Sequence, residues 1–272
     1  MIKLTSQSTN LKAYSFRFLF FLWGLILSFT SYSGNYCTEI PKLIHQLNTH
    51  HISPVAINEN SEREILKLFI NELDEHANYL TQAELKSILG FQIKGRSAIT
   101  DEPCQFLQIA SAIFKRRLLF TDSLVALLLS KPLDFKKADT IFFSGDTATY
   151  AGSEKEFINR WRKWLKYQIL DEYYEIKTDS ANNLLAPEGV FAEQEVFIRK
   201  KLSIKYHRKI NKLLQHPGGF ENYVSYLLLN AIALRFDPHT EFFTKEIKEN
   251  FEAETSPVLL SFGIEFEEND QG

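Results

Sequence analysis

The chain has 272 residues, of which 44% are hydrophobic and 24% are charged, and its formal net charge is −3. This composition allows a sizeable buried core and excludes a disordered protein. The slightly negative charge also argues against a nucleic-acid-binding protein, which would carry a strongly basic surface.

The first 33 residues have the three-part layout of a secretory signal peptide. Three basic residues and no acid precede the apolar run "FLFFLWGLILSF", and the small residues Ser31, Ser33 and Gly34 come after it. A membrane-spanning helix needs about 20 apolar residues, which this run reaches only with its polar flanks. We therefore predict a signal peptide over residues 1–33 and an exported, periplasmic protein. An uncleaved leader that anchors the chain to the inner membrane is the alternative.

The chain contains two cysteines, Cys37 and Cys104. In an oxidising compartment two cysteines could close one disulfide, so this pair is a possible disulfide. Their spacing in the sequence does not show whether they meet. Two unpaired or partly buried thiols are therefore the alternative.

Capping signals mark the first helices after an irregular stretch that contains Pro41 and Pro54. Ser61 and Thr81 are each followed three residues later by a glutamate, which is the pattern of a capping box. Apolar residues then recur at helical spacing, and Gly90 ends the second run. We expect two helices within residues 61–90, joined by the turn "DEHANYL".

Four longer helices come next. The first begins after Pro103 and ends before Pro132, the second begins at the box "SEKE" that starts at Ser153, and the others span residues 187–214 and 220–236. A polar, glycine-containing loop covers residues 135–152. The positions predicted to face the core are Phe106, Ile109, Ala110, Ile113, Phe114, Phe120, Leu124 and Leu128; then Trp161, Trp164, Leu165, Gln168 and Ile169; and finally Tyr223, Tyr226, Leu227, Asn230, Ala231 and Leu234.

The pattern changes near the end of the chain. Residues 245–254 favour a short helix, whereas Leu260, Phe262, Ile264 and Phe266 alternate with polar residues and glycine in the period of a strand. The backbone of a lone strand needs a second strand for its hydrogen bonds. We therefore predict a mainly α fold, with a multi-helix domain over residues 34–245 and the truncated start of a second domain over residues 246–272.

The segment "FDPHTEFFT" lies where the last long helix must end. Pro238 lacks an N–H and disfavours helix at Asp237, so the helix stops there. We expect the Asp237 side chain to accept backbone N–H groups on the far side, and Thr240 to cap the segment after it. His239 has no evident chemical role, and a plain helix-to-helix joint explains these residues.

This segment, with "FEAE" and "SFGIEFEE" after it, resembles the junction of the C-terminal processing peptidases of the tail-specific protease branch. There an Asp-Pro-His-Thr segment, here Asp237, Pro238, His239 and Thr240, links a helical N-terminal domain to a PDZ domain. Upstream, "LDEHANYLTQAEL", "WRKWLKYQIL" and "KLSIKYHRKINKLL" are similar to further segments of that branch. The resemblance covers most of the chain after the leader.

The resemblance implies a secreted serine peptidase with a Ser–Lys dyad, in which a neutral lysine accepts the serine proton. The sequence contains neither Ser-x-x-Lys nor Gly-x-Ser-x-Gly, so we expect no catalytic residue within it. The expected function is therefore that of an N-terminal fragment that positions protein substrates. In the family the PDZ domain binds the C-termini of proteins as an added strand, and the matching loop would be Phe262, Gly263 and Ile264.

A non-catalytic exported adaptor descended from such a protease is the alternative function, and a membrane-anchored interaction domain is a third. No cofactor or metal is expected, because the His50–His51 pair lacks the spacing of metal ligands. The basic clusters at residues 115–117 and 199–201 favour solvated faces or ion pairs over polyanion sites. Trp161 and Trp164 lie one turn apart and favour core packing.

Overall fold

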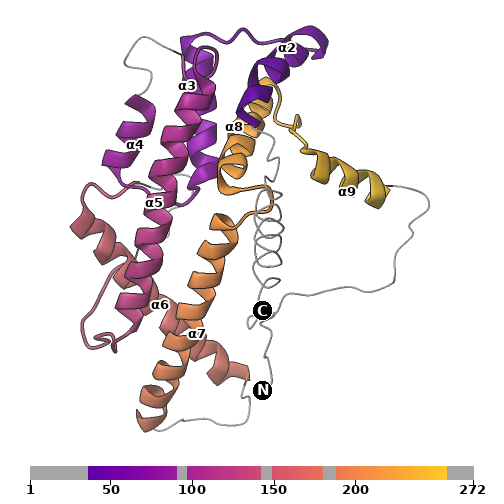
Figure 1. Ribbon diagram of the computed structural model, residues 1–272. Helices are drawn as coiled ribbons and strands as arrows, with labels where there is room; N and C mark the ends of the chain where they lie inside the picture. Colours follow the sequence, from indigo (N-terminus) through magenta and orange to yellow (C-terminus); the bar gives the residue numbers. More distant parts are fainter. Residues whose placement is uncertain (1–35, 91–96, 142–148, 180–187, 256–272) are drawn as a thin grey trace, which may run out of the picture. The chain divides into compact units, whose positions relative to one another are not determined.

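The computed structural model describes residues 36–90, 97–141, 149–179 and 188–255 (Figure 1). The fold is mainly α, as predicted, and the described ranges contain no strand. The helices are the 3₁₀ helix η1 (Tyr36–Glu39) and the α-helices α2 (Ile40–His50), α3 (Glu59–Leu73), α4 (Gln82–Leu89), α5 (Pro103–Leu129), α6 (Glu154–Asp179), α7 (Glu188–Leu214), α8 (Phe220–Phe236) and α9 (Lys245–Thr255).

The central helix is α8, which packs against α3, α5, α2 and η1 (Figure 1). Apolar residues lie on nearly all of its sides, as expected for a helix surrounded by others. The face predicted for this helix is therefore too narrow: Leu227 and Ala231 are buried and the half-buried Tyr223 and Tyr226 pack against the core, but residues on the other sides of the helix are buried as well. The buried residues of α8 are Phe220, Asn222, Val224, Ser225, Leu227, Leu228, Leu229, Ala231, Ile232, Ala233 and Phe236.

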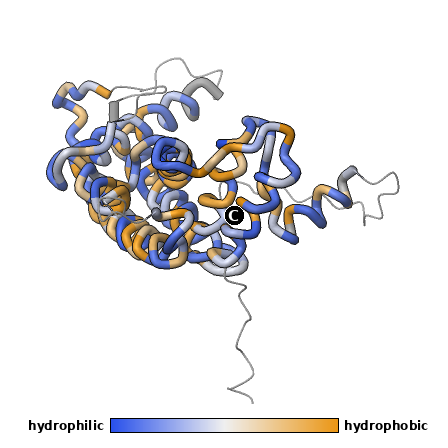
Figure 2. Tube along the Cα trace, turned by 90° about the horizontal axis from the view of Figure 1, so that it is seen from above, coloured by the Kyte–Doolittle hydropathy of each residue, from blue (hydrophilic) through white to orange (hydrophobic). Residues whose placement is uncertain are grey.

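The long helix α5 packs against α7, α8, α4 and α6. Figure 2 shows hydrophilic and hydrophobic residues interspersed along the chain, and a helix such as α5 buries the side on which its apolar residues gather. On α5 the predicted stripe is correct for Phe106, Ala110 and Phe114. It is wrong for Ile109 and Phe120, whose exposed fractions are 38% and 36%. The core side of α5 is instead completed by Leu107, Leu118, Val125 and Leu129.

Two helix starts differ from the prediction. Helix α2 occupies a stretch that Pro41 marks as irregular in the sequence, but Pro41 lies in the first turn, where no backbone N–H is needed for the helix. Helix α3 begins one turn earlier than expected because Asn58 is its cap. The Asn58 side chain accepts the N–H of Ser61 at 3.1 Å, and the Ser61 hydroxyl accepts the N–H of Asn58 at 2.7 Å.

A disulfide joins the start of the described chain to the start of α5. Cys37 in η1 and Cys104 in the first turn of α5 are bonded, with their Cα atoms 5.1 Å apart and 67 positions apart in the sequence. Cys37 is buried in the core beside Ile40. The bond therefore ties η1, and α2 after it, to the helix that contacts most of the others.

The chain after α8 turns as the sequence suggests, with one difference. Helix α8 ends at Phe236, and the Asp237 carboxylate accepts the N–H of His239 at 2.7 Å. Thr240 caps no helix; its hydroxyl lies 3.3 Å from Nε2 of His51. The cap of α9 is Thr244, whose hydroxyl accepts the N–H of Ile247 at 3.2 Å. Helix α9 confirms the short helix predicted over residues 245–254.

Candidate functional site

The turn between α3 and α4 is organised by one buried carboxylate. Asp74 accepts the backbone N–H groups of Asn78 at 2.8 Å, of Tyr79 at 3.1 Å and of Leu80 at 2.8 Å. Burial raises the pKa of the Asp74 carboxyl, and these backbone hydrogen bonds oppose that effect only in part. The turn also places Ala77 in the left-handed region, at φ +50°. Two carbonyl groups of the turn accept hydrogen bonds from neighbouring helices, that of Tyr79 from α5 and that of Asn78 from α6.

Replacing Asp74 with asparagine is expected to lower the free energy of unfolding by about 1–3 kcal/mol. The amide nitrogen cannot accept a hydrogen bond, so one or more of the buried N–H groups loses its acceptor. Chemical denaturation at neutral pH measures the change. Glu75→Gln alters an exposed neighbour and is the control, expected within about 0.5 kcal/mol of the unaltered chain. Equal unfolding midpoints for Asp74→Asn and the unaltered chain would refute this role.

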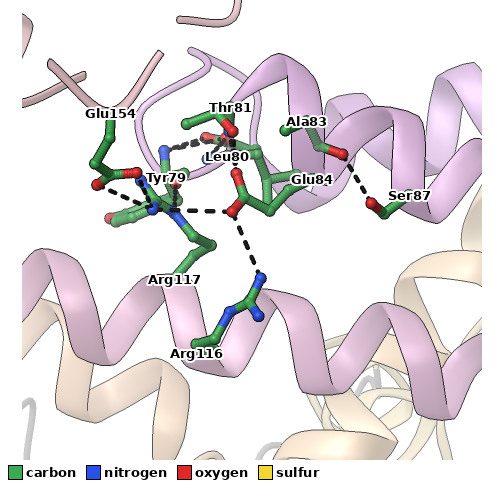
Figure 3. Close-up of polar contacts among 10 residues, drawn as sticks. Tyr79, Leu80, Thr81, Ala83, Glu84, Ser87, Arg116, Arg117 and Glu154 are labelled. Atoms are coloured by element: carbon green, nitrogen blue, oxygen red, sulfur yellow. Dashed lines mark hydrogen bonds and ion pairs between the residues drawn. The ribbon is translucent and has the colours of Figure 1, made fainter. Parts of the chain in front are cut away.

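Arg117 of α5 connects this turn to α4 and α6 (Figure 3). Only 4% of the residue is exposed. Its Nε donates to the Tyr79 carbonyl at 2.8 Å, and its Nη1 donates to the Glu154 carboxylate at 3.0 Å. The guanidinium also lies 4.2 Å from the centre of the Phe157 ring, which is a cation–π contact. One side chain thus holds three elements together.

Glu84 on α4 is the second acid near Arg117, at 3.9 Å (Figure 3). The predicted capping box is confirmed, because the Glu84 carboxylate accepts the N–H of Thr81 at 3.0 Å. Burial alone would raise the pKa of Glu84, but the hydrogen bonds from Thr81 and the charges of Arg117 and Arg116 lower it below its ordinary value. Two residues of the basic cluster at 115–117, Arg116 and Arg117, therefore form ion pairs with Glu84.

A second ionic cluster fixes the segment before α6. Asp139 binds Arg162 at 2.7 Å and Lys166 at 3.0 Å. The hydrogen bonds from Arg162 and Lys166 hold the pKa of the Asp139 carboxyl well below its usual range. Because Arg162 and Lys166 both belong to α6, the residues just before Thr140 are held along that helix.

The two tryptophans of α6 pack as predicted, and each has its N–H satisfied. Trp161 is 5% exposed and donates to the Asn78 carbonyl at 2.9 Å, while Trp164 donates to the Tyr206 hydroxyl at 2.6 Å. The Trp161 and Tyr206 rings meet edge to face at 5.4 Å. Trp161 therefore links the Asp74 turn to α6, and Trp164 links α6 to α7.

A cavity of about 380 Å³ lies between the Asp74 turn and the first half of α6. The turn contributes His76, and α6 contributes Phe157, Arg160, Lys163 and both tryptophans. This volume lies in the range of small-ligand sites, which combine apolar walls with a few polar groups. We take this cavity as the candidate functional site.

In the described part of the chain, no group of three or more metal-binding side chains is arranged to hold an ion. Within the same ranges, no helix has both the length and the apolar character that a membrane crossing requires.

A comparison with known protein families identifies the region that contains this site. The model of the tail-specific protease N-terminal domain matches residues 43–246, well over half of the chain. This chain belongs to the tail-specific protease N-terminal domain family. The matched range runs from α2 to the first turn of α9, so it contains the Asp74 turn, Arg117 and the cavity. A search among curated proteins finds no match.

The site residues predicted from the sequence do not line the cavity of this tail-specific protease N-terminal domain. Asp237, Pro238, His239 and Thr240 come after α8, and the disulfide joins η1 to α5; none of them lines the cavity. Phe262, Gly263 and Ile264, expected in a peptide-binding loop, lie outside the described residues. Sequence reasoning missed Arg160 and Lys163 as cavity residues, although both flank the noted tryptophans in "RWRKW".

Proposed function

We propose that this domain positions protein substrates for an exported serine peptidase of the tail-specific type and does not itself cleave them. The family match over residues 43–246 supports this proposal most strongly, because the matched range contains the helical domain and its cavity. The buried hydrogen bonds of Asp74 and Arg117 fix the turn between α3 and α4 against α5, and a rigid domain of this kind can hold a substrate in a fixed place. The partners are unfolded or extended protein chains, bound near their C-termini.

Two features support the exported location. The Cys37–Cys104 disulfide is typical of proteins in oxidising compartments, because cytosolic reductants keep thiols reduced. The leader over residues 1–33 has the layout of a secretory signal. We therefore place the protein in the periplasm.

A binding assay tests this function. The purified chain is titrated into a fluorescently labelled protein that is permanently unfolded by reduction and alkylation, and anisotropy reports binding. We expect saturable binding of the unfolded form and little binding of the same protein in its native form. Equal binding of both forms, or no binding of the unfolded form at millimolar concentration, would contradict the proposed function.

A further inference from the structure

The connection between α8 and α9, residues 237–244, is held by hydrogen bonds at both of its ends (Figure 1). The carbonyl of Asp237 accepts the N–H of Thr240 at 3.0 Å, and its carboxylate accepts the N–H of His239 at 2.7 Å. At the other end, the Thr244 hydroxyl accepts the N–H of Ile247 and caps α9. The turn after α8 and the start of α9 are therefore both defined within the connection itself.

The middle of the connection is bound to α8. The N–H of Phe242 donates to the side-chain carbonyl of Asn230 at 3.3 Å, across 12 positions of the sequence. The ring of Phe242 lies 6.4 Å from the ring of Tyr226, which precedes Asn230 by about one helical turn. After the turn at Pro238 the chain consequently runs back along the helix that it has just left.

A second element, the loop between α2 and α3, holds the connection through His51. The Nε2 of His51 lies 3.3 Å from the Thr240 hydroxyl, and the ring meets that of Phe236 edge to face at 5.6 Å. The Nδ1 lies 3.1 Å from the backbone nitrogen of Ser53 and 3.0 Å from its carbonyl oxygen. Because a hydroxyl both donates and accepts, each ring nitrogen has a partner in either tautomer.

We propose that residues 237–244 form a rigid clamp, with His51 as its positioning residue, that fixes the direction in which α9 leaves the helical domain. A connection without such contacts would sample many conformations, since ordering each residue costs conformational entropy. Here contacts from α8 and from the α2–α3 loop offset that cost. The clamp gives Thr240 and Phe242 a role that a simple turn does not require. It holds whether or not the domain binds a substrate, so it does not depend on the proposed function.

A distance measurement between spin labels tests the fixed direction of α9. The labels are attached through Lys67→Cys on α3 and Asn250→Cys on α9, both at exposed positions, with the Cys37–Cys104 disulfide kept oxidised. We expect one narrow distribution of distances in the labelled chain and a clearly broader one when His51→Ala is added. A broad distribution without that substitution, or equal widths with and without it, would overturn the proposal.

Hydrogen exchange at the Phe242 amide locates the clamp at His51. His51→Ala removes a hydrogen bond and a ring contact and is expected to speed exchange about 10-fold or more, whereas Thr240→Val removes only the hydrogen bond and is expected to speed it about 5-fold. His51→Gln keeps a side-chain N–H and should restore part of the protection.

The preceding histidine provides the matched control. His50 is exposed at the end of α2, and His50→Ala is expected to leave the exchange of the Phe242 amide unchanged. Amides in the buried part of α3 should exchange at the same rate in all of these variants, because the clamp opens locally. Equal exchange at Phe242 in His50→Ala and His51→Ala, or an equal acceleration in α3, would show that His51 does not hold this connection.

Discussion

Replacing Arg117 with alanine is expected to lower the free energy of unfolding by about 3 kcal/mol or more, because this buried guanidinium has several partners at once. The change leaves the Tyr79 carbonyl without its donor and takes a nearby positive charge away from the partly buried Glu84. It also removes the packing of the guanidinium on the Phe157 ring. Urea unfolding followed by circular dichroism measures the loss.

The neighbouring arginine provides a matched control. The Arg116 side chain is 68% exposed and lies 3.5 Å from the same Glu84 carboxylate (Figure 3), so Arg116→Ala is expected to change stability by less than about 1 kcal/mol. Arg117→Lys keeps a positive charge but loses the forked geometry, and its stability should fall between the two. Equal losses for Arg116→Ala and Arg117→Ala would show that the buried network is not the cause.

Removing the disulfide has the other large expected effect. A bridge across 67 positions restricts the unfolded chain, and the chain-entropy estimate for such a loop is about 4 kcal/mol. The double variant Cys37→Ala, Cys104→Ala should therefore unfold at a clearly lower denaturant concentration than the oxidised chain. Its melting temperature should also fall.

A reductant separates the effect of the bond from the effect of the side chains. Dithiothreitol should lower the stability of the unaltered chain toward that of the double variant, and it should leave the double variant unchanged. If the unaltered chain unfolds at the same denaturant concentration with and without the reductant, the Cys37–Cys104 bond does not stabilise this domain.

Local signals in the sequence predict most of the helices. The Thr81 box and the start at Ser153 are correct because a helix cap depends on residues only three positions apart. The Ser61 box fails because Asn58, three residues earlier, is an equally good cap and extends the helix by a turn. Helix α2 escapes prediction because a proline usually breaks a helix, whereas Pro41 sits in the first turn.

The candidate site depends on contacts between distant residues, which sequence patterns do not reveal. Arg117 appears in the sequence only as part of a basic cluster, yet its Nε meets the carbonyl of Tyr79, a residue 38 positions away. Trp161 likewise meets the carbonyl of Asn78 across 83 positions. Asp74 begins the segment "DEHANYL", which was predicted as a turn. Its hydrogen bonds to the backbone of that turn depend on the conformation of the folded chain, which the sequence does not reveal. The stripe predicted for α8 is too narrow, since a helix surrounded by others has no single apolar side.

We propose above that this domain holds protein substrates without cutting them. The most direct measurement is the intact mass of an unfolded protein substrate after prolonged incubation with the purified chain, at concentrations where anisotropy shows that they are bound. We expect the substrate to keep its full mass while remaining bound. Peptide products that form in proportion to the amount of this chain would contradict the claim.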